Sequence, residues 1–193
     1  LLRSEFSKWR KYSIKRRSRL EFRKLLINMG GVDIDNVTEK VLDELKNCNL
    51  PNDIDINVVM GGSAPHLERI KSKVNALPYK VEVKVGVDNM AEIMANADIA
   101  IGAAGSTTWE RCCLGLPTIQ IVIADNQINI ARNLDSINAI QLNNSLHQLS
   151  ESIDSISYSI SKISLASSSI VDGKGASRVA KFITSKENYV ALF

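Results

Sequence analysis

Cysteine and histidine are scarce in this 193-residue chain, which contains three of the first and two of the second. The cysteines, Cys48, Cys112 and Cys113, are odd in number and two are adjacent, so they do not form a disulfide framework and predict a reducing, cytoplasmic location. His66 and His147 have no cysteine pair nearby, which argues against a metal centre. We expect neither a metal nor a cofactor.

Long apolar runs are also absent. No stretch approaches the roughly 20 apolar residues that span a bilayer, and Leu1 and Leu2 are followed at once by charges instead of a signal-peptide pattern. We therefore expect no membrane partner. Hydrophobic residues still make up 45% of the chain, which is enough for a real core.

The net charge of +3 conceals an asymmetry along the chain. Residues 1–24 contain ten Lys or Arg and two Glu, a balance of +8, so residues 25–193 carry −5. Such a basic arm is either a polyanion-binding module that grips RNA or anionic lipid, or a solvated lead-in or interdomain helix. The arm lacks a nucleic-acid motif and an acidic body follows it. We therefore favour a lead-in over residues 1–23 and expect no nucleic-acid partner.

Apolar strands and helical periodicities alternate along residues 24–184. The predicted strands are 24–29, 55–60, 81–85, 99–101, 118–124 and 139–142. Alternation at this spacing predicts βαβ units and an α/β fold, a Rossmann-like doubly wound parallel sheet of six strands. Residues 185–193 are expected to form a loose tail.

Some local features accompany these elements. Asn36 is a natural N-cap for the helix that follows the first strand. Apolar residues at spacings of three and four predict one helix over 146–163, although serine is a mediocre helix former. Residues 167–169 are expected to be a loop, and a last helix is predicted over 176–184.

Small residues crowd the turn after the predicted strand 99–101. Residues 106–108 are candidate caps for a short helix, which Gly115 ends. The free N–H groups of a first helical turn favour an anion, and tiny side chains let a phosphate approach the backbone. Glu110 would repel phosphate but suits a ribose diol. The alternative is an ordinary strand-to-helix connection, since neither G-x-G-x-x-G nor a P-loop is present.

Other glycine turns, and the polar loop 125–127, follow the remaining strands. Because the carboxyl ends of parallel strands share one edge of a sheet, we expect these turns to converge there. That convergence favours nucleotide binding over an ordinary connection.

These motifs resemble the PseG-type UDP-sugar hydrolases of pseudaminic acid biosynthesis, a GT-B family related to the peptidoglycan glycosyltransferase MurG. The resemblance rests on LLRSEF at 1–6, MGGVDIDN at 29–36, NMAEIMANADIAIGAAGSTTWERCCLGLPT at 89–118, IADNQ at 123–127 and VDGKGASRV at 171–179. It implies that residues 24–184 are the UDP-sugar-binding, C-terminal domain of a GT-B fold.

The resemblance also implies a set of nucleotide-sugar-binding residues: Gly30, Gly31, Gly86, Val87, Met90, Gly105, Ser106, Thr107, Glu110, Asn126 and Gln127. Residues 105–107 would cradle the diphosphate, Glu110 would hold the ribose hydroxyls, and the turn 86–90 would meet uracil. Residues 126–127 would approach the sugar or phosphate, and 30–31 would line the cleft.

In that family two domains close on a UDP-sugar, and the catalytic histidine belongs to the amino-terminal domain. Neither His66 nor His147 lies in a matching motif, so the resemblance implies no catalytic residue in this chain and a missing N-terminal catalytic domain as its partner. The implied parent reaction is attack of water on a UDP-linked 2,4-diacetamido-trideoxyhexose, which releases UDP and the free sugar. The alternative parent is a MurG-like UDP-GlcNAc glycosyltransferase.

Overall fold

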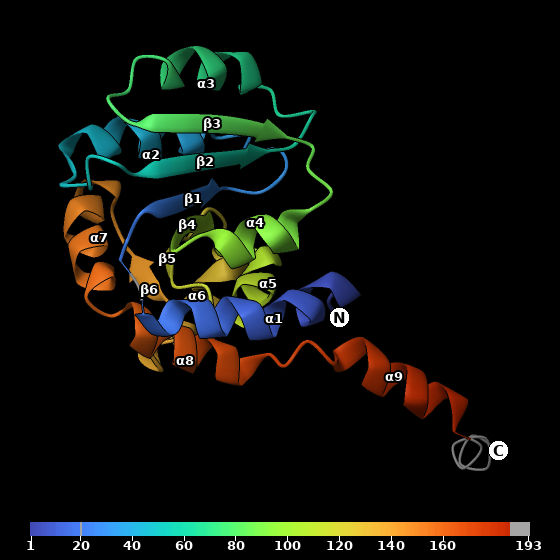
Figure 1. The fold of residues 1–193 in the computed structure, drawn as a ribbon. Helices are drawn as coiled ribbons and strands as arrows, with labels where there is room; N and C mark the ends of the chain where they lie inside the picture. The colour runs from blue at the N-terminus through green and yellow to red at the C-terminus, as the bar shows by residue number, and fades with distance from the viewer. Residues whose placement is uncertain (20, 186–193) are drawn as a thin grey trace.

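Six parallel strands form one sheet in the computed structural model, which describes residues 1–19 and 21–185. The strands are β1 (Lys24–Asn28), β2 (Asp55–Met60), β3 (Lys80–Val85), β4 (Ile99–Ala103), β5 (Thr118–Ile121) and β6 (Gln141–Asn143). Their order is β3-β2-β1-β4-β5-β6 (Figure 1), as in dinucleotide-binding folds. The predicted doubly wound α/β fold is confirmed. The predicted tail 185–193 lies outside the described residues, except for Ser185.

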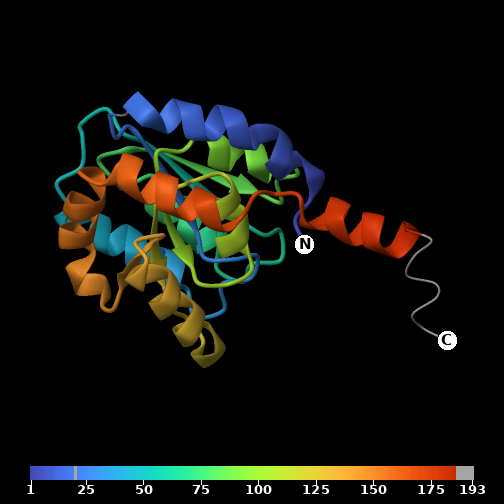
Figure 2. The ribbon, with the colours of Figure 1, turned by 90° about the horizontal axis from the view of Figure 1, so that it is seen from below.

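Helices cover both faces of this sheet. They are α1 (Ser4–Arg16), α2 (Val37–Glu44), α3 (Leu67–Val74), α4 (Met90–Asn96), α5 (Thr107–Cys113), α6 (Ile128–Ser136), α7 (Leu149–Ser157), α8 (Ile160–Ile170) and α9 (Gly175–Thr184). Helices α2, α3 and α7 pack on one face, and α1, α4 and α5 pack on the other (Figures 1 and 2). Helix α8 packs against α5 and α1, and α9 projects away from the sheet.

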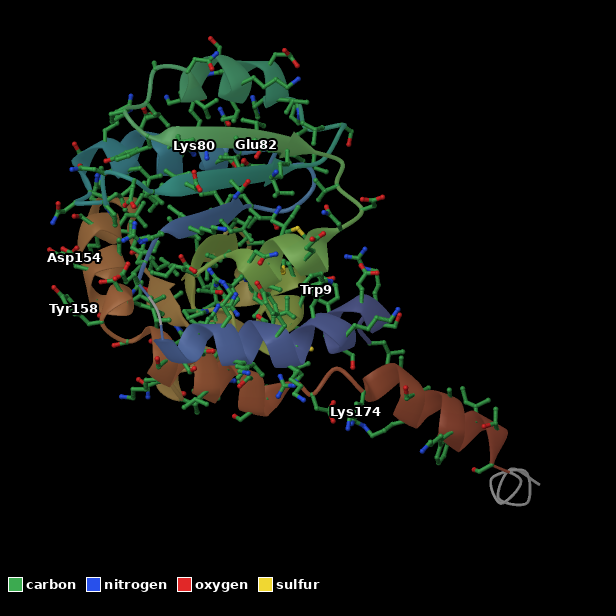
Figure 3. The ribbon with its side chains drawn as sticks, viewed as in Figure 1. Trp9, Lys80, Glu82, Asp154, Tyr158 and Lys174 are labelled. Carbon is green, nitrogen blue, oxygen red and sulfur yellow. The ribbon has the colours of Figure 1, made fainter. Side chains whose placement is uncertain are left out.

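The central strands are apolar on both faces because each face is covered. In β1, Leu25 and Ile27 join the core beneath α2 and α7, while Leu26 joins the core beneath α4. Such continuous apolar strands are typical of buried parallel sheets. The edge strand β3 differs, since Lys80 and Glu82 lie on it among exposed or half-buried positions (Figure 3). The predicted solvated face of this strand is confirmed.

The prediction of one helix over 146–163 is wrong. The chain forms a 3₁₀ turn and then α7, breaks at Tyr158, which is 92% exposed (Figure 3), and resumes as α8. Residues 167–169 belong to α8 and are not a loop. Each of these three serine hydroxyls donates to the carbonyl three residues before it, which satisfies the hydroxyl inside the helix.

Two further expectations need correction. Strand β5 ends at Ile121, not at 124, because both of its neighbours stop pairing there. Asn36 precedes α2 but does not cap it, since its backbone adopts a left-handed φ of +51°. The carboxylate of Asp33 caps the helix instead and accepts hydrogen bonds from the N–H groups of Val37 at 2.8 Å and Thr38 at 2.9 Å.

The basic lead-in helix α1 is anchored to the domain. Phe6 is fully buried, and so is Arg17 just beyond the end of the helix. The Arg17 guanidinium donates to the carbonyls of Met94 at 2.7 Å, Ala97 at 2.6 Å and Leu114 at 2.8 Å. These carbonyls belong to the carboxyl ends of α4 and α5, so one side chain satisfies both helix ends.

Other arginines of α1 are also bound within the domain. Arg10 donates to the carbonyls of Cys113 at 2.6 Å and Ser168 at 2.7 Å, and Arg16 pairs with the buried carboxylate of Asp98. A substantial part of the basic charge is therefore used inside the fold. Among the described helices, none is both long and apolar enough to cross a membrane.

Glycine turns at the carboxyl edge of the sheet are joined by main-chain hydrogen bonds. The N–H of Gly61 donates to the carbonyl of Gly31 at 3.0 Å, and the N–H of Gly86 donates to that of Met60 at 3.0 Å. A Cβ on Gly61 would overlap the Gly31 carbonyl oxygen, whereas a Cβ on Gly62 would meet no atom within 4 Å. The close approach of the Gly31 carbonyl therefore requires glycine at position 61.

We predict that Arg17→Met lowers the free energy of unfolding by about 3 kcal/mol, because the Met94 carbonyl loses its side-chain donor and two further buried carbonyls each lose one of two donors. Ser13 still donates to the Leu114 carbonyl, and Arg16 to that of Ala97. Lys15→Met, at an exposed position of the same helix, is the matched control and should change stability by less than about 0.5 kcal/mol. Urea denaturation of the three proteins measures the difference. Equal midpoints for the wild type and Arg17→Met would contradict the anchoring role.

We also predict that Gly61→Ala lowers stability by about 3 kcal/mol, because the blocking atom belongs to the main chain and cannot rotate away. Gly62→Ala should change stability by less than about 1 kcal/mol, in the stabilising direction, since it meets no neighbour and restricts the unfolded chain. Thermal melts of the pair test this, and a Gly61→Ala melt as high as that of Gly62→Ala would refute the close approach.

Candidate functional site

A cleft of about 310 Å³ opens at the carboxyl edge of the sheet, between the ends of β1 and β4. The winding direction of the sheet reverses between these two strands, which is where open α/β sheets bind ligands. The cleft is lined by Arg3, Asn28, Gly30, Gly31, Val59, Met60, Gly61, Gly86, Val87, Met90, Thr107 and Glu110. Among these, the residues predicted from the sequence are Gly30, Gly31, Gly86, Val87, Met90, Thr107 and Glu110.

Bare backbone forms one wall of this cleft. Gly30 and Gly86 adopt φ values of +96° and +59°, which side-chain-bearing residues rarely adopt. A Cβ on Gly30, Gly31 or Gly86 would meet no protein atom within 4 Å, so the space beside these residues is open. A ligand can therefore approach their main chain closely.

The turn from β4 to α5 carries unused hydrogen-bond donors. The N–H groups of Thr108 and Trp109 donate to the carbonyls of Gly105 at 3.0 Å and Ser106 at 3.2 Å. The N–H groups of Gly105, Ser106 and Thr107 donate to no acceptor in the described part of the chain. Three successive free donors can bind the oxygens of one anion.

The predicted side-chain caps of α5 are not formed. No side chain of residues 106–108 accepts a hydrogen bond from the first turn of the helix. The hydroxyls of Thr107 and Thr108 instead accept from the Arg111 guanidinium, at 3.1 and 3.2 Å. Because the helix has only seven residues, the free N–H groups matter more than its dipole.

Glu110 enters the cleft as a half-buried carboxylate, with its side chain 18% exposed. Its oxygens accept no hydrogen bond from the described residues, and the nearest cation, the Arg3 guanidinium, is 3.7 Å from Oε1. Burial raises the pKa of Glu110, and the charges of Arg3 and Arg111 offset part of that rise. Its acceptor capacity is open toward the cleft.

The remaining predicted residues lie beside the cleft. Gly105 and Ser106 belong to the turn with the free donors, although they do not line the cleft. A Cβ on Gly105 would lie 4.0 Å from Nε2 of Gln127, so Gln127 flanks that turn. Its Oε1 accepts from the N–H of Ile123 at 3.1 Å, which fixes the side chain. Asn126 is exposed, and the structure does not bring it to the cleft.

Two residues of the site, one in the cleft lining and one behind it, were not predicted. Asn28 ends β1, where its Nδ2 donates to the Val59 carbonyl at 2.9 Å. Arg111 is 2% exposed and donates to the Ala103 carbonyl at 2.6 Å. The sequence did contain one indication of the buried Arg111 side chain. Gly102 lies inside a strand, and a glycine there often marks the close approach of another group.

Within residues 1–19 and 21–185, no group of three or more His, Cys, Asp or Glu side chains is placed to hold a metal ion. The site consists of main-chain donors, one carboxylate and buried amide and guanidinium groups.

Comparison with known proteins gives both a family and relatives. The sequence profile of the glycosyltransferase family 28 C-terminal domain matches residues 25–181. The chain is 33% identical over 130 residues to an uncharacterised protein of Methanocaldococcus jannaschii. The matched region covers 66% of this chain and 26% of that protein. It is 30% identical over 111 residues to the spore coat polysaccharide biosynthesis protein SpsG of Bacillus subtilis, covering 57% and 32%.

A third relative is the UDP-N-acetylglucosamine--N-acetylmuramyl-(pentapeptide) pyrophosphoryl-undecaprenol N-acetylglucosamine transferase of Helicobacter pylori. It is 34% identical over 110 residues, which is 54% of this chain and 30% of that protein. The chain thus spans about a quarter to a third of the length of the curated relatives it matches.

Solved structures share the fold. MurG of Acinetobacter baumannii superimposes with a TM-score of 0.74 at 18% identity, covering 90% of this chain and 53% of that one. Anabaena HepE in complex with UDP-glucose gives a TM-score of 0.62 at 14% identity, covering 90% and 49%. The sheet order and the profile match over residues 25–181 agree, and the chain belongs to the glycosyltransferase family 28 C-terminal domain family.

Proposed function

We propose that this chain is the nucleotide-sugar-binding half of a GT-B enzyme and binds UDP in the cleft between β1 and β4. One juxtaposition carries the proposal. The free N–H groups of residues 105–107 are suited to a diphosphate, and the open carboxylate of Glu110 lies one turn further along the same helix. A nucleoside diphosphate carries both an anionic diphosphate and a ribose diol, so it complements the free N–H groups and the carboxylate together.

Uracil is assigned to the turn 86–90. Gly86 offers main chain that a planar base can approach, and Val87 and Met90 add apolar surface on the same wall of the cleft. Gln127 flanks the diphosphate turn and is assigned to the phosphate or the sugar. HepE, with the same fold, was crystallised in complex with UDP-glucose and with UDP, which supports a uridine nucleotide as the ligand.

For the parent reaction we propose hydrolysis of a UDP-2,4-diacetamido-trideoxyhexose in the biosynthesis of pseudaminic acid for a surface polysaccharide or flagellar glycan. The GSTTWERCCLGLP and ADNQ segments support this assignment. A MurG-like UDP-GlcNAc transferase is the second candidate, and the 34% identity to the Helicobacter pylori transferase supports it.

In both reactions UDP leaves the anomeric carbon as the glycosidic bond breaks. Negative charge then develops on the phosphate, where the donors of residues 105–107 stabilise it. The base that takes a proton from water or from an acceptor is assigned to the part of the enzyme outside this chain, because no histidine lies in the cleft. Three free, buried cysteines support a reducing cytoplasm as the compartment.

We predict that the 193-residue chain binds UDP with a Kd below about 1 mM, which is the weak-binding end of the usual range of enzyme KM values. It should release no UDP from UDP-GlcNAc or from a UDP-diacetamido sugar, because the catalytic base and domain closure are absent. Calorimetric titration and a UDP-release assay measure these properties. Absence of UDP binding, or displacement of UDP by a mixed RNA at the same concentration, would contradict the proposal.

We further predict that Glu110→Gln weakens binding of UDP and of uridine by about tenfold each, because both ligands carry the ribose diol. Glu68→Gln, in the first turn of α3 and exposed, is the matched control and should leave both affinities unchanged. Chemical-shift titrations measure the affinities. Equal UDP affinity for the wild type and Glu110→Gln would remove the ribose assignment.

The same variant makes a pH-dependent prediction. Burial raises the pKa of Glu110, so the folded state disfavours its ionised form, and stability is lost as pH rises from 4.5 through the raised pKa. Glutamine resembles the protonated acid and lacks that penalty. Melts of the wild type and Glu110→Gln should therefore agree at pH 4 and favour the variant at pH 7. A lower melting temperature for the variant at pH 7 would show that the carboxylate stabilises the helix.

A further inference from the structure

A row of register partners crosses the sheet from the wall of the cleft into the buried layer. Asn28 of β1, Gly102 of β4 and Gln120 of β5 are register partners. A Cβ on Gly102 would lie 2.5 Å from Nη1 of Arg111, so the guanidinium occupies the space that a side chain there would fill. Gln120 is fully buried, and its Nε2 donates to the hydroxyl of Thr108 at 3.1 Å.

Arg111 is a buried cation without a carboxylate partner in the described part of the chain. Its Nη2 donates to the Ala103 carbonyl and the Thr108 hydroxyl, and its Nη1 donates to the Thr107 hydroxyl. Nε has no acceptor. Burial lowers the pKa of Arg111 to about 10, so the side chain remains charged at neutral pH.

A buried charge without a directly paired counter-charge destabilises a fold, and apolar side chains of similar size often replace such groups without loss. Arg17, which is also fully buried, directs its donors to helix-end carbonyls and has Asp98 as a charged neighbour. The charged neighbour of Arg111 is Glu110, which lines the cleft and forms no ion pair with it in the described part of the chain. Arg111 caps no helix end. Its hydroxyl partners belong to the turn that carries the free N–H groups, so its charge lies directly behind that turn.

We propose that Arg111 is a positioning residue for the diphosphate, and that the bound ligand adds negative charge beside a guanidinium that no carboxylate of the described chain contacts directly. Arg111 holds Thr107 and Thr108 in place and contributes a positive field at residues 105–107 without touching the ligand. The inference rests on the proposed UDP site and extends it from the cleft wall to the buried layer beneath.

The test compares ligands of different charge. UDP, UMP and uridine are titrated into the wild type, Arg111→Met and Arg111→Gln. Removing the buried unit charge behind this turn, where the effective dielectric constant is about 20, should weaken UDP binding by about tenfold or more. UMP should lose less, and uridine should stay within about twofold. The loss should persist at 0.5 M salt, because buried charges are screened little.

Two controls separate charge from structure. Arg132→Met removes the same charge at an exposed position and should leave UDP affinity within about twofold. Arg111→Lys keeps the charge and should retain the ratio of UDP to uridine affinity within about threefold. Arg111→Gln keeps a donor beside Thr108, so it tests the proposal if Arg111→Met fails to fold.

The Arg111 Nε–H resonance of the wild type gives a measurement that needs no variant. It should shift on addition of UDP and stay unmoved by uridine. The proposal is overturned if both neutral variants lose UDP and uridine affinity by the same factor, if neither loses UDP affinity, or if the resonance responds equally to both ligands. A wild type that binds no UDP would instead refute the proposed function.

Discussion

One buried guanidinium fixes the two helices that begin at the cleft. Arg17 donates to carbonyls at the carboxyl ends of α4 and α5, while the amino ends of the same helices carry Met90, Thr107 and Glu110. Both helices have only seven residues, so clamping one end restrains the other. The geometry of the site therefore depends on a contact at the opposite end of these helices, made by the segment just after α1.

The position of the site follows from how the sheet is wound. Strand β1 pairs with β2 on one side and β4 on the other, and the helices that follow β1 and β4 lie on opposite faces. The turns after these two strands diverge and leave an opening between them. Main-chain hydrogen bonds between neighbouring turns hold the wall of that opening without side chains, which keeps it accessible to a ligand.

Much of this arrangement was predictable because its signals are local. The bounds of β2 were predicted correctly, since an apolar run lies between a polar loop and a glycine pair. Gly30, Gly86 and Glu110 were placed at one edge because each follows or flanks a strand end. The capping of α2 was not predictable, because the left-handed backbone of Asn36, which leaves the cap to Asp33, is set by the surrounding loop.

Arg111 and Arg17 were missed for one shared reason. An arginine is expected at the surface, and only the folded contacts show that most of its donors are used inside. Arg17 donates to residues distant in the sequence, whereas Arg111 donates to residues 103, 107 and 108 close by. In the serine-rich α8 the error was to predict a loop where a helix forms. Its serine hydroxyls donate to carbonyls of their own helix, so a composition typical of loops is compatible with a regular helix.

The contact between Gly61 and Gly31 bears on how such a sequence can change. The atom that blocks a side chain at position 61 is a main-chain carbonyl oxygen, which all twenty residue types carry. A substitution at position 31 therefore cannot make room for a side chain at position 61. A second mutation at position 31 would not make a change at position 61 neutral. Position 62, one peptide bond away, has no such neighbour and leaves space for a Cβ.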